Sequence, residues 1–294
     1  MNLSGKPWTA ALVWVWLAVT ILSACSNAEA EVEPVEGKVY YSDQVSVLMY
    51  HDLTEGKTSK NALSVKDFKK QMELLKRNGF QVIGMKEYSE YILNQGPVPD
   101  NAVLMTFDDG YESFYKLAYP VLKEYGYPAT NFVIVKYIDE RIGAPKITWD
   151  QMREMQKDGM TFYSHTYDSH VYVEEDEQGG KKPALTARKY LVEEKRQETA
   201  EEAKRRVAED LAKAEERLKE ELGNADSILS FPYGAFNDTV MDVLQSLDIQ
   251  LSFTVRRGIN SRADANSYRI NGANAKENPK TVIDHLKKIK DSNS

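Results

Sequence analysis

Short apolar runs alternate with segments of helical periodicity along most of this chain, and the alternation limits the folds open to it. The apolar runs read as buried β-strands at residues 45–50, 102–107, 129–135, 160–164, 227–231, 250–255 and 268–270. Helical patterns fall between many of them, at residues 64–79, 86–94, 115–125, 149–159, 238–247 and 279–289. Strands that alternate with helices form a parallel sheet covered by helices. The sequence therefore predicts an α/β fold, either an open sheet or a barrel.

Two of the helices carry local signals for where they begin or end. Ser64 is followed three residues later by Asp67, a pattern that predicts an N-cap at Ser64. Gly79 is a suitable residue for ending that helix. Pro120 lies inside the helix predicted at residues 115–125, so we expect a kink or a late helix start there.

Residues 173–224 break the alternation and are dominated by Glu, Lys, Arg and Ala. Apolar residues three and four positions apart predict a long amphipathic helix with one narrow stripe, made of Ala203, Val207, Leu211, Ala214, Leu218 and Leu222. We expect this charged helical insertion to cover the barrel and to present its charges to solvent. A docking surface for a partner helix is the alternative. Residues 173–190, which precede the helix, read as a mobile excursion.

The N-terminal segment has the character of a targeting signal. Residues 10–24 are apolar, which is short for a membrane span of about 20 residues but suits a secretory signal. The run ends in Leu22, Ser23 and Ala24, and together with Cys25 these residues resemble the bacterial lipobox, whose cysteine is lipidated. An uncleaved anchor helix with an incidental cysteine is the alternative.

These features divide the chain into a signal peptide at residues 1–24, a polar tether at residues 25–44 and a folded domain at residues 45–294. Lipidation at Cys25 would anchor the protein to the extracytoplasmic face of the cell membrane. Because Cys25 is the only cysteine, disulfides are excluded and thiolate metal sites are not expected. The net charge of −7, with no basic patch, argues against a nucleic-acid partner.

Two adjacent carboxylates follow the second predicted strand. Asp108 and Asp109 come directly after Phe107, at the strand end where sheet and barrel enzymes place catalytic groups. Neighbouring carboxylates near apolar residues repel each other unless a cation or a shared proton relieves the repulsion. A solvent-facing turn is the alternative for this stretch taken alone.

Two of the four histidines also follow a strand. His165 and His170 lie in "SHTYDSH", after the strand predicted at residues 160–164. Their separation of five does not fit one face of a helix, so a shared ion would be bound from a loop. Two imidazoles and one carboxylate make a three-ligand site with room for water, as in catalytic zinc sites. Unrelated surface histidines are the alternative.

A third segment, "SFPYGAFND", places Pro232, Tyr233 and Gly234 in a rigid turn after another strand. Such a turn could direct the backbone N–H of Tyr233 into the mouth of the barrel. The signal is weak by itself, because turns of this composition are common.

Taken together, "TFDDG", "SHTYDSH" and "FPYG" resemble the first three motifs of the NodB-type polysaccharide deacetylases, carbohydrate esterase family 4. The resemblance extends from about residue 45 to about residue 289. "VLMYHDL" and the wide histidine spacing look most like the poly-N-acetylglucosamine deacetylase branch. The resemblance implies a distorted (β/α) barrel, a divalent metal held by Asp-His-His, and removal of acetyl groups from an N-acetylated glucosamine polysaccharide.

Carried over to this sequence, the resemblance implies that Asp108 is the general base and that Asp109, His165 and His170 are the metal ligands. Tyr233 matches the position that stabilises the oxyanion. Zinc is the metal that we expect, and cobalt, nickel and iron also suit these ligand types.

This sequence departs from the family pattern in three places. The histidine spacing is one residue wider than the commoner one. Many members have an arginine that pairs with the base just before the Pro-aromatic-Gly turn, and here residues 228–231 contain none. Members often place a general-acid histidine in a late Leu-x-His motif, and the only late histidine here, His285, lies in a segment that reads as a surface helix. We therefore prefer His51, at the end of the first strand, as the further catalytic residue.

These departures leave two alternatives to a poly-β-1,6-N-acetylglucosamine deacetylase. The same chemistry could act on peptidoglycan or chitin oligomers. A catalytically weak glycan-binding lipoprotein is an alternative of a different class.

Overall fold

The computed structural model describes residues 1–2, 38–60, 62–274 and 277–289. The chain divides into two units, residues 1–33 and residues 34–294, and the description below concerns the second. Cys25, all but the first two residues of the predicted signal peptide and most of the predicted tether lie outside the described residues. Within the described part of the chain, no helix has both the length and the apolar character needed to cross a bilayer.

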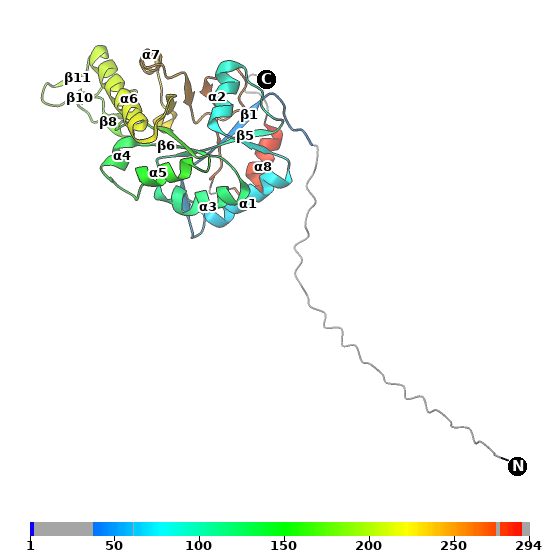
Figure 1. Ribbon diagram of the computed structural model, residues 1–294. Helices are drawn as coiled ribbons and strands as arrows, with labels where there is room; N and C mark the ends of the chain where they lie inside the picture. Colours follow the sequence, from blue (N-terminus) through cyan, green and yellow to red (C-terminus); the bar gives the residue numbers. More distant parts are fainter. Residues whose placement is uncertain (3–37, 61, 275–276, 290–294) are drawn as a thin grey trace. The chain divides into compact units, whose positions relative to one another are not determined.

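A nine-stranded sheet forms the centre of the fold, and every strand pair in it is parallel (Figure 1). The strand order is β14-β13-β12-β7-β6-β5-β1-β15. The ninth strand, β4, lies outside this order and pairs with β5, next to β6. The strands are β1 (Val45–Tyr50), β4 (Gln81–Ile83), β5 (Ala102–Asp108), β6 (Thr130–Val133), β7 (Thr161–Ser164), β12 (Ile228–Ser230), β13 (Leu251–Phe253), β14 (Asn266–Ser267) and β15 (Ile270–Asn271).

The sheet curls until its two ends come close together. β14 and β15 lie at opposite ends of the strand order, yet only Tyr268 and Arg269 separate them in the sequence. Three peptide units span at most about 11 Å. The rings of Phe132 on β6 and Phe253 on β13, with centroids 5.1 Å apart, also meet across the concave side. The predicted distorted (β/α) barrel is confirmed.

In the segment predicted as one strand at residues 268–270, residues 268–269 instead link these two short strands, and Ile270 begins β15. The single-strand prediction was wrong there because residues 266–271 cross from one end of the sheet to the other.

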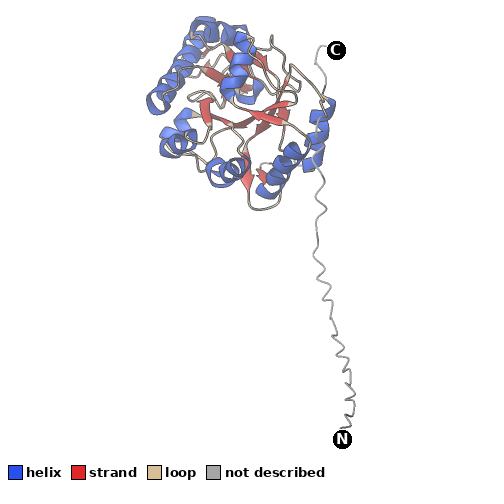
Figure 2. Ribbon diagram, turned by 45° about the vertical axis from the view of Figure 1, so that its right-hand side comes forward, coloured by secondary structure: helices blue, strands red, loops and turns tan. Residues whose placement is uncertain are grey.

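Helices surround the strands, as Figure 2 shows. They are α1 (Val65–Arg77), α2 (Met85–Asn94), α3 (Tyr119–Tyr125), α4 (Val135–Asp139), α5 (Trp149–Gln156), α6 (Ala200–Leu222), α7 (Asp238–Ser246) and α8 (Pro279–Lys288). A separate apolar cluster fills the concave side of the sheet and includes Val45, Val47, Ala102, Leu104, Phe132, Leu251 and Phe253. Alternate residues such as Met105 and Phe107 point the other way, into the layer beneath the helices.

The predicted helix boundaries are confirmed at α1 and α3. The Ser64 hydroxyl accepts the Asp67 N–H at 3.0 Å and caps α1. Pro120 lies in the first turn of α3, where its missing N–H costs no hydrogen bond. A five-residue π-helical turn, Phe114–Ala118, precedes α3 and accommodates the proline.

The charged insertion is more ordered than expected at its start. One antiparallel hairpin, β8 (Tyr172–Glu174) with β9 (Lys181–Pro183), occupies the segment expected to be a mobile excursion, and a second, β10 (Tyr190–Leu191) with β11 (Arg196–Gln197), begins at its last residue. Arg206 on α6 donates to the carbonyls of Ala184 and Ala187 and pairs with Glu198. This segment is therefore fastened to α6.

The long helix itself, α6, follows the prediction. Its buried residues are Ala203, Val207, Leu211, Ala214 and Leu218, which are five of the six predicted stripe positions. The stripe faces the barrel wall, where α6 lies against β7, α5 and α7. The helix therefore covers the barrel, and its apolar stripe is not left open for a partner helix.

The predicted tether is too long at its C-terminal end. Tyr41 is buried, and its hydroxyl donates to the Ala102 carbonyl at 2.9 Å. The Tyr40 N–H donates to Asn101 Oδ1 at 2.7 Å. The packed part of the chain thus begins before β1.

Candidate active site

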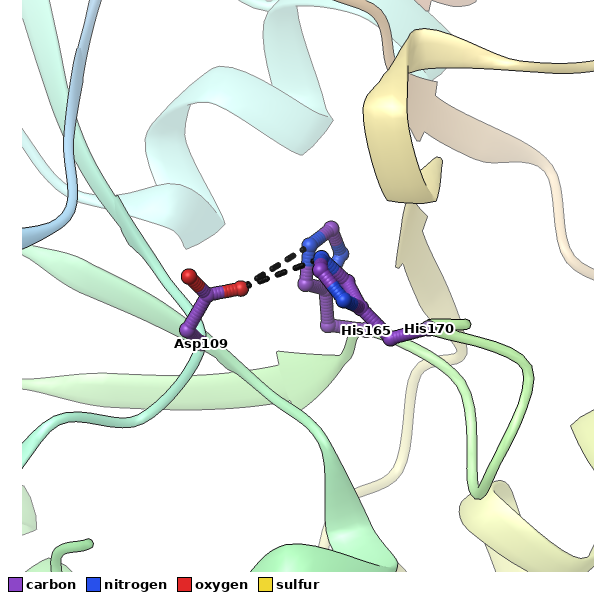
Figure 3. Close-up of side chains that lie close together, drawn as sticks. All are labelled: Asp109, His165 and His170. Carbon is purple, nitrogen blue, oxygen red and sulfur yellow. Dashed lines mark ion pairs between the residues drawn. The ribbon is translucent and has the colours of Figure 1, made fainter. Parts of the chain in front are cut away.

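Asp109, His165 and His170 converge at the carboxyl ends of β5 and β7 (Figure 3). The Oδ1 atom of Asp109 is 3.5 Å from Nε2 of His165 and 3.2 Å from Nε2 of His170. One ligand atom from each of the three residues lies within 4.8 Å of the other two. The structure therefore brings together the three residues that the sequence predicts as metal ligands.

The backbone at Asp109 is in a conformation that few side chains adopt. Its φ is +73°, in the left-handed region, and Gly110 follows with φ +66°. A Cβ atom on Gly110 would lie 3.2 Å from Val133 Cγ1 and Ile138 Cδ1, so the tight packing favours glycine there. This turn separates the two neighbouring carboxylates and directs them to different partners.

The ring of His165 is fixed in one orientation. Its Nδ1 lies 2.8 Å from the Ser230 carbonyl, so this nitrogen carries the proton and donates it to that carbonyl. Burial lowers the pKa of His165 to about 4, so the ring is neutral at physiological pH. The other nitrogen, Nε2, then carries a free lone pair and faces Asp109. This is the form of imidazole that binds metals.

The donor set fits a divalent metal ion. Asp109 Oδ1 is buried and has no hydrogen-bond partner among the described residues, which is costly for a carboxylate. In a tetrahedral zinc site with bonds of about 2.0 Å, ligand atoms lie about 3.3 Å apart. The spacing of Asp109 Oδ1 from the two imidazole nitrogens is close to that value. Two imidazoles and one carboxylate suit zinc and other transition metals.

Asp108 points to the concave side of the sheet and pairs with Arg269. The guanidinium donates to both carboxylate oxygens at 2.8 Å, and the two side chains are 0% and 3% exposed. Arg269 also donates to the Thr254 carbonyl and to Ser230 Oγ. Burial alone would raise the pKa of Asp108, but the charge and hydrogen bonds of Arg269 and the nearby His165 and His51 together outweigh it and hold that pKa well below its usual range. Asp108 is therefore ionised.

Arg269 is the residue that sequence reasoning missed. The expected arginine is absent before the Pro-aromatic-Gly turn, and the link between β14 and β15 supplies one instead. The available signal was a charged residue between Tyr268 and Ile270, inside a short apolar run.

His51 is also brought to this site. It follows β1, and its Nε2 lies 4.0 Å from Asp108 Oδ2. Its side chain is 41% exposed, so it is open to a substrate that approaches from solvent. His285 lies elsewhere, on α8 in the helical layer, where its Nδ1 is 3.5 Å from Glu277.

Tyr233 forms part of the rim. Its φ is +58°, and its hydroxyl donates to the His170 carbonyl at 3.2 Å. Its ring lies 4.6 Å from the ring of His170 and 4.6 Å from the ring of Tyr172. Tyr233 and Tyr172 are 40% and 53% exposed. A short row of aromatic rings therefore leads from the histidines to solvent.

Two further residues near Asp109 were not anticipated from the sequence. The Nζ atom of Lys146 lies 3.8 Å above the ring of Tyr111. Burial, and then the charge of Asp109, raises the pKa of Tyr111 to about 12. The phenol is therefore neutral and can donate a hydrogen bond at the edge of the site.

Sequence comparison finds relatives across most of the chain. The sequence model of the polysaccharide deacetylase family matches residues 95–252, more than half of the chain. The chain is 26% identical over 274 residues to a poly-β-1,6-N-acetyl-D-glucosamine N-deacetylase of Escherichia coli O157:H7, covering 85% of this chain and 41% of that protein. It is 29% identical over 261 residues to a Staphylococcus epidermidis protein with the same name, covering 83% of each.

Structural comparison agrees with these matches. A de-N-acetylase from Aggregatibacter actinomycetemcomitans is 27% identical and superposes with a TM-score of 0.75, covering 83% of this chain and 100% of that one. The chain spans less than half the length of the Escherichia coli relatives, at 41% and 35%.

Proposed function

The chain belongs to the polysaccharide deacetylase family, and from this premise we propose that it hydrolyses the acetamide groups of a poly-β-1,6-N-acetylglucosamine. The observation that carries the proposal is the buried, unpaired carboxylate oxygen of Asp109 facing two imidazole nitrogens, with an ionised Asp108 next to it in the chain. Relatives named poly-β-1,6-N-acetyl-D-glucosamine N-deacetylase support the choice of polymer.

Asp109, His165 and His170 would hold a divalent metal, with zinc as our first choice. When bound, such a metal lowers the pKa of a coordinated water and polarises a carbonyl group. Amide hydrolysis needs both effects, because the amide carbon is a poor electrophile. The three protein ligands leave room for water and substrate.

Asp108 is the proposed general base. It accepts a proton from the water that attacks the acetyl carbon, while Arg269 keeps its carboxylate ionised and oriented. The same pairing lowers the basicity of Asp108, so the proton is held weakly there. His51 Nε2, 4.0 Å away, can receive that proton and deliver it to the nitrogen as the C–N bond breaks. The products are acetate and a free glucosamine amine.

Tyr233 is the proposed oxyanion-stabilising residue, through its backbone N–H. Its φ of +58° places it in the left-handed region, and contacts with His170 hold it there. Donors of this kind contribute roughly 3 kcal/mol in other hydrolases.

The exposed aromatic rings at the rim favour a sugar ligand. Tyr172 and Tyr233 offer apolar faces beside the histidines, and pyranose rings have apolar faces of their own. Exposed aromatic patches beside a polar site mark ligand-binding grooves. Tyr172 belongs to the first hairpin of the insertion, so this segment would contact the glycan.

The test is acetate release by a soluble protein that begins at Lys38, which retains the packed Tyr41. We expect acetate from β-1,6-linked N-acetylglucosamine oligomers, and loss of at least 100-fold in kcat/KM for Asp109→Asn and for His165→Ala. Full activity in both variants would refute the metal site. Faster release from chitin or peptidoglycan fragments would change the substrate, and tight binding without turnover would indicate a glycan-binding protein.

We further propose that lipidated Cys25 anchors the protein at the extracytoplasmic face of the membrane. The apolar residues 10–24 and the Leu22, Ser23, Ala24, Cys25 sequence support this proposal. Metabolic labelling with a fatty acid should label the wild-type protein and not Cys25→Ser. Equal labelling of both proteins would contradict it.

A further inference from the structure

The loop that carries two of the three candidate ligands is held by contacts from outside it. This histidine loop, residues 165–170, connects β7 to the insertion. The Val135 N–H donates to the Thr166 carbonyl of this loop at 3.1 Å, and the Lys136 N–H donates to the Tyr167 carbonyl at 3.0 Å. The start of α4 thus fixes two carbonyl groups of the loop.

The matching N–H groups of the histidine loop are fixed by Asp210, which lies on α6. Asp210 Oδ2 accepts the Tyr167 N–H, and Asp210 Oδ1 accepts the Asp168 N–H, both at 2.9 Å. Successive backbone N–H groups form a small anion-binding concavity, and hydrogen bonds to a carboxylate are stronger than neutral ones. Each oxygen of this carboxylate accepts a backbone N–H of the histidine loop.

The histidine loop needs such support because its backbone is strained beside a ligand. Thr166, which directly follows His165, is fully buried and has φ +72°. A β-branched residue in the left-handed region is an outlier that persists only where surrounding contacts impose it. The two N–H groups held by Asp210 belong to the next two residues.

Side-chain contacts clamp the same loop between α4 and α6. Lys136 of α4 pairs with Asp168 at 2.7 Å. Lys213, one turn after Asp210 on α6, places its Nζ 3.8 Å above the Tyr167 ring. Side chains of both α4 and α6 therefore hold the histidine loop in place.

We propose that Asp210 is a positioning residue for the metal site. Its two hydrogen bonds hold the histidine loop so that His165 and His170 keep their rings 4.8 Å apart and face Asp109. The inserted helix α6 is then part of the support of the site, although it supplies no ligand. The inference rests on the proposed metal site.

The experiment measures metal affinity and not only activity. The full-length chain is stripped with a chelator, and the dissociation constant for zinc is measured by competition with a chromophoric chelator. Asp210→Asn keeps the size of the side chain but leaves one acceptor oxygen for two N–H groups, and Asp210→Ala removes both acceptors. Glu209→Gln is the matched control, because Glu209 is an exposed neighbour on the same helix.

We expect the dissociation constant to rise roughly 10- to 100-fold in Asp210→Ala, less in Asp210→Asn, and not at all in Glu209→Gln. Excess zinc should restore acetate release by the Asp210 variants, and the visible spectrum of the cobalt-loaded Asp210→Asn protein should change.

Unchanged zinc affinity in folded Asp210 variants would overturn the proposal, and so would failure of both variants to fold. A wild-type protein that binds no metal would instead refute the proposed function on which the inference rests.

Discussion

Replacing Glu215 with glutamine is expected to remove a contribution to the stability of the protein that falls as the pH rises. Glu215 lies on α6, and its Oε1 is buried without a hydrogen-bond partner among the described residues. Burial raises the pKa of Glu215 from 4.5 to about 7, and a hydrogen bond with Ser227 opposes this shift only in part.

The sign follows from the two protonation states. Between pH 4.5 and pH 7 the folded protein keeps the Glu215 proton, whereas the unfolded chain has lost it. The stabilising effect of the protonated acid is therefore fully present below pH 4.5 and is lost as the pH rises through 7. The difference of 2.5 pH units amounts to about 3 kcal/mol in the free energy of unfolding.

The assay is urea denaturation at several pH values from 5 to 8, with a chelator present so that metal binding does not contribute. The stability of Glu215→Gln relative to wild type should increase by about 2.5 kcal/mol from pH 5 to pH 8. His165, with its pKa lowered to about 4 by burial, has the opposite pH dependence, but it is common to both proteins and cancels. Glu216→Gln, an exposed neighbour, is the control. A difference between Glu215→Gln and wild type that stays constant with pH would refute the reasoning.

Three other substitutions test other parts of the structure. Arg269→Met leaves the Asp108 carboxylate buried and unpaired, so urea denaturation should show a loss of about 3–5 kcal/mol, reduced when Asp108→Asn is added. Equal losses with and without Asp108→Asn would contradict this. Tyr172→Ala should raise KM several-fold for long oligomers but not for the shortest substrate, and equal effects on both would count against stacking. Leu211→Ala, at a fully buried stripe position, should lower the free energy of unfolding by about 2–5 kcal/mol, and a loss near zero would mean that α6 does not pack as described.

The central strands could be predicted because they are buried on both faces. Residues 45–50 and 102–107 are apolar runs interrupted only by Ser46 and Thr106, which is how strands of a helix-covered parallel sheet read. The run at residues 129–135 was predicted too long, because Val135 begins α4 instead of extending β6. Apolar composition alone does not distinguish the end of a buried strand from the start of a buried helix.

The hairpins of the insertion could not be predicted in the same way. β8 to β11 have two or three residues each and are mostly polar, so they carry no periodicity. Arg206 on α6 donates to the Ala184 and Ala187 carbonyls, in the link between the two hairpins. Such side-chain contacts between distant segments leave no local pattern in the sequence.

The candidate metal ligands were predictable because Asp109 and His165 directly follow recognisable strands, His170 lies in the loop after the second of them, and parallel strands end at the same edge. Arg269 and Asp210 were not, for a common reason. Arg269 meets Asp108 across 161 residues of sequence, and Asp210 meets the histidine loop across 42 and 43. Their roles depend on how the barrel closes and on where α6 lies.

The position of Arg269 also bears on the order in which the protein is made. Both outermost strands of the sheet, β14 and β15, lie within residues 266–271, and so does the only guanidinium that pairs with Asp108 in the described chain. While the ribosome is still synthesising earlier residues, the sheet has neither of its two edges and the buried carboxylate has no counter-charge. A single late hexapeptide therefore supplies both ends of the curled sheet and the counter-charge of Asp108.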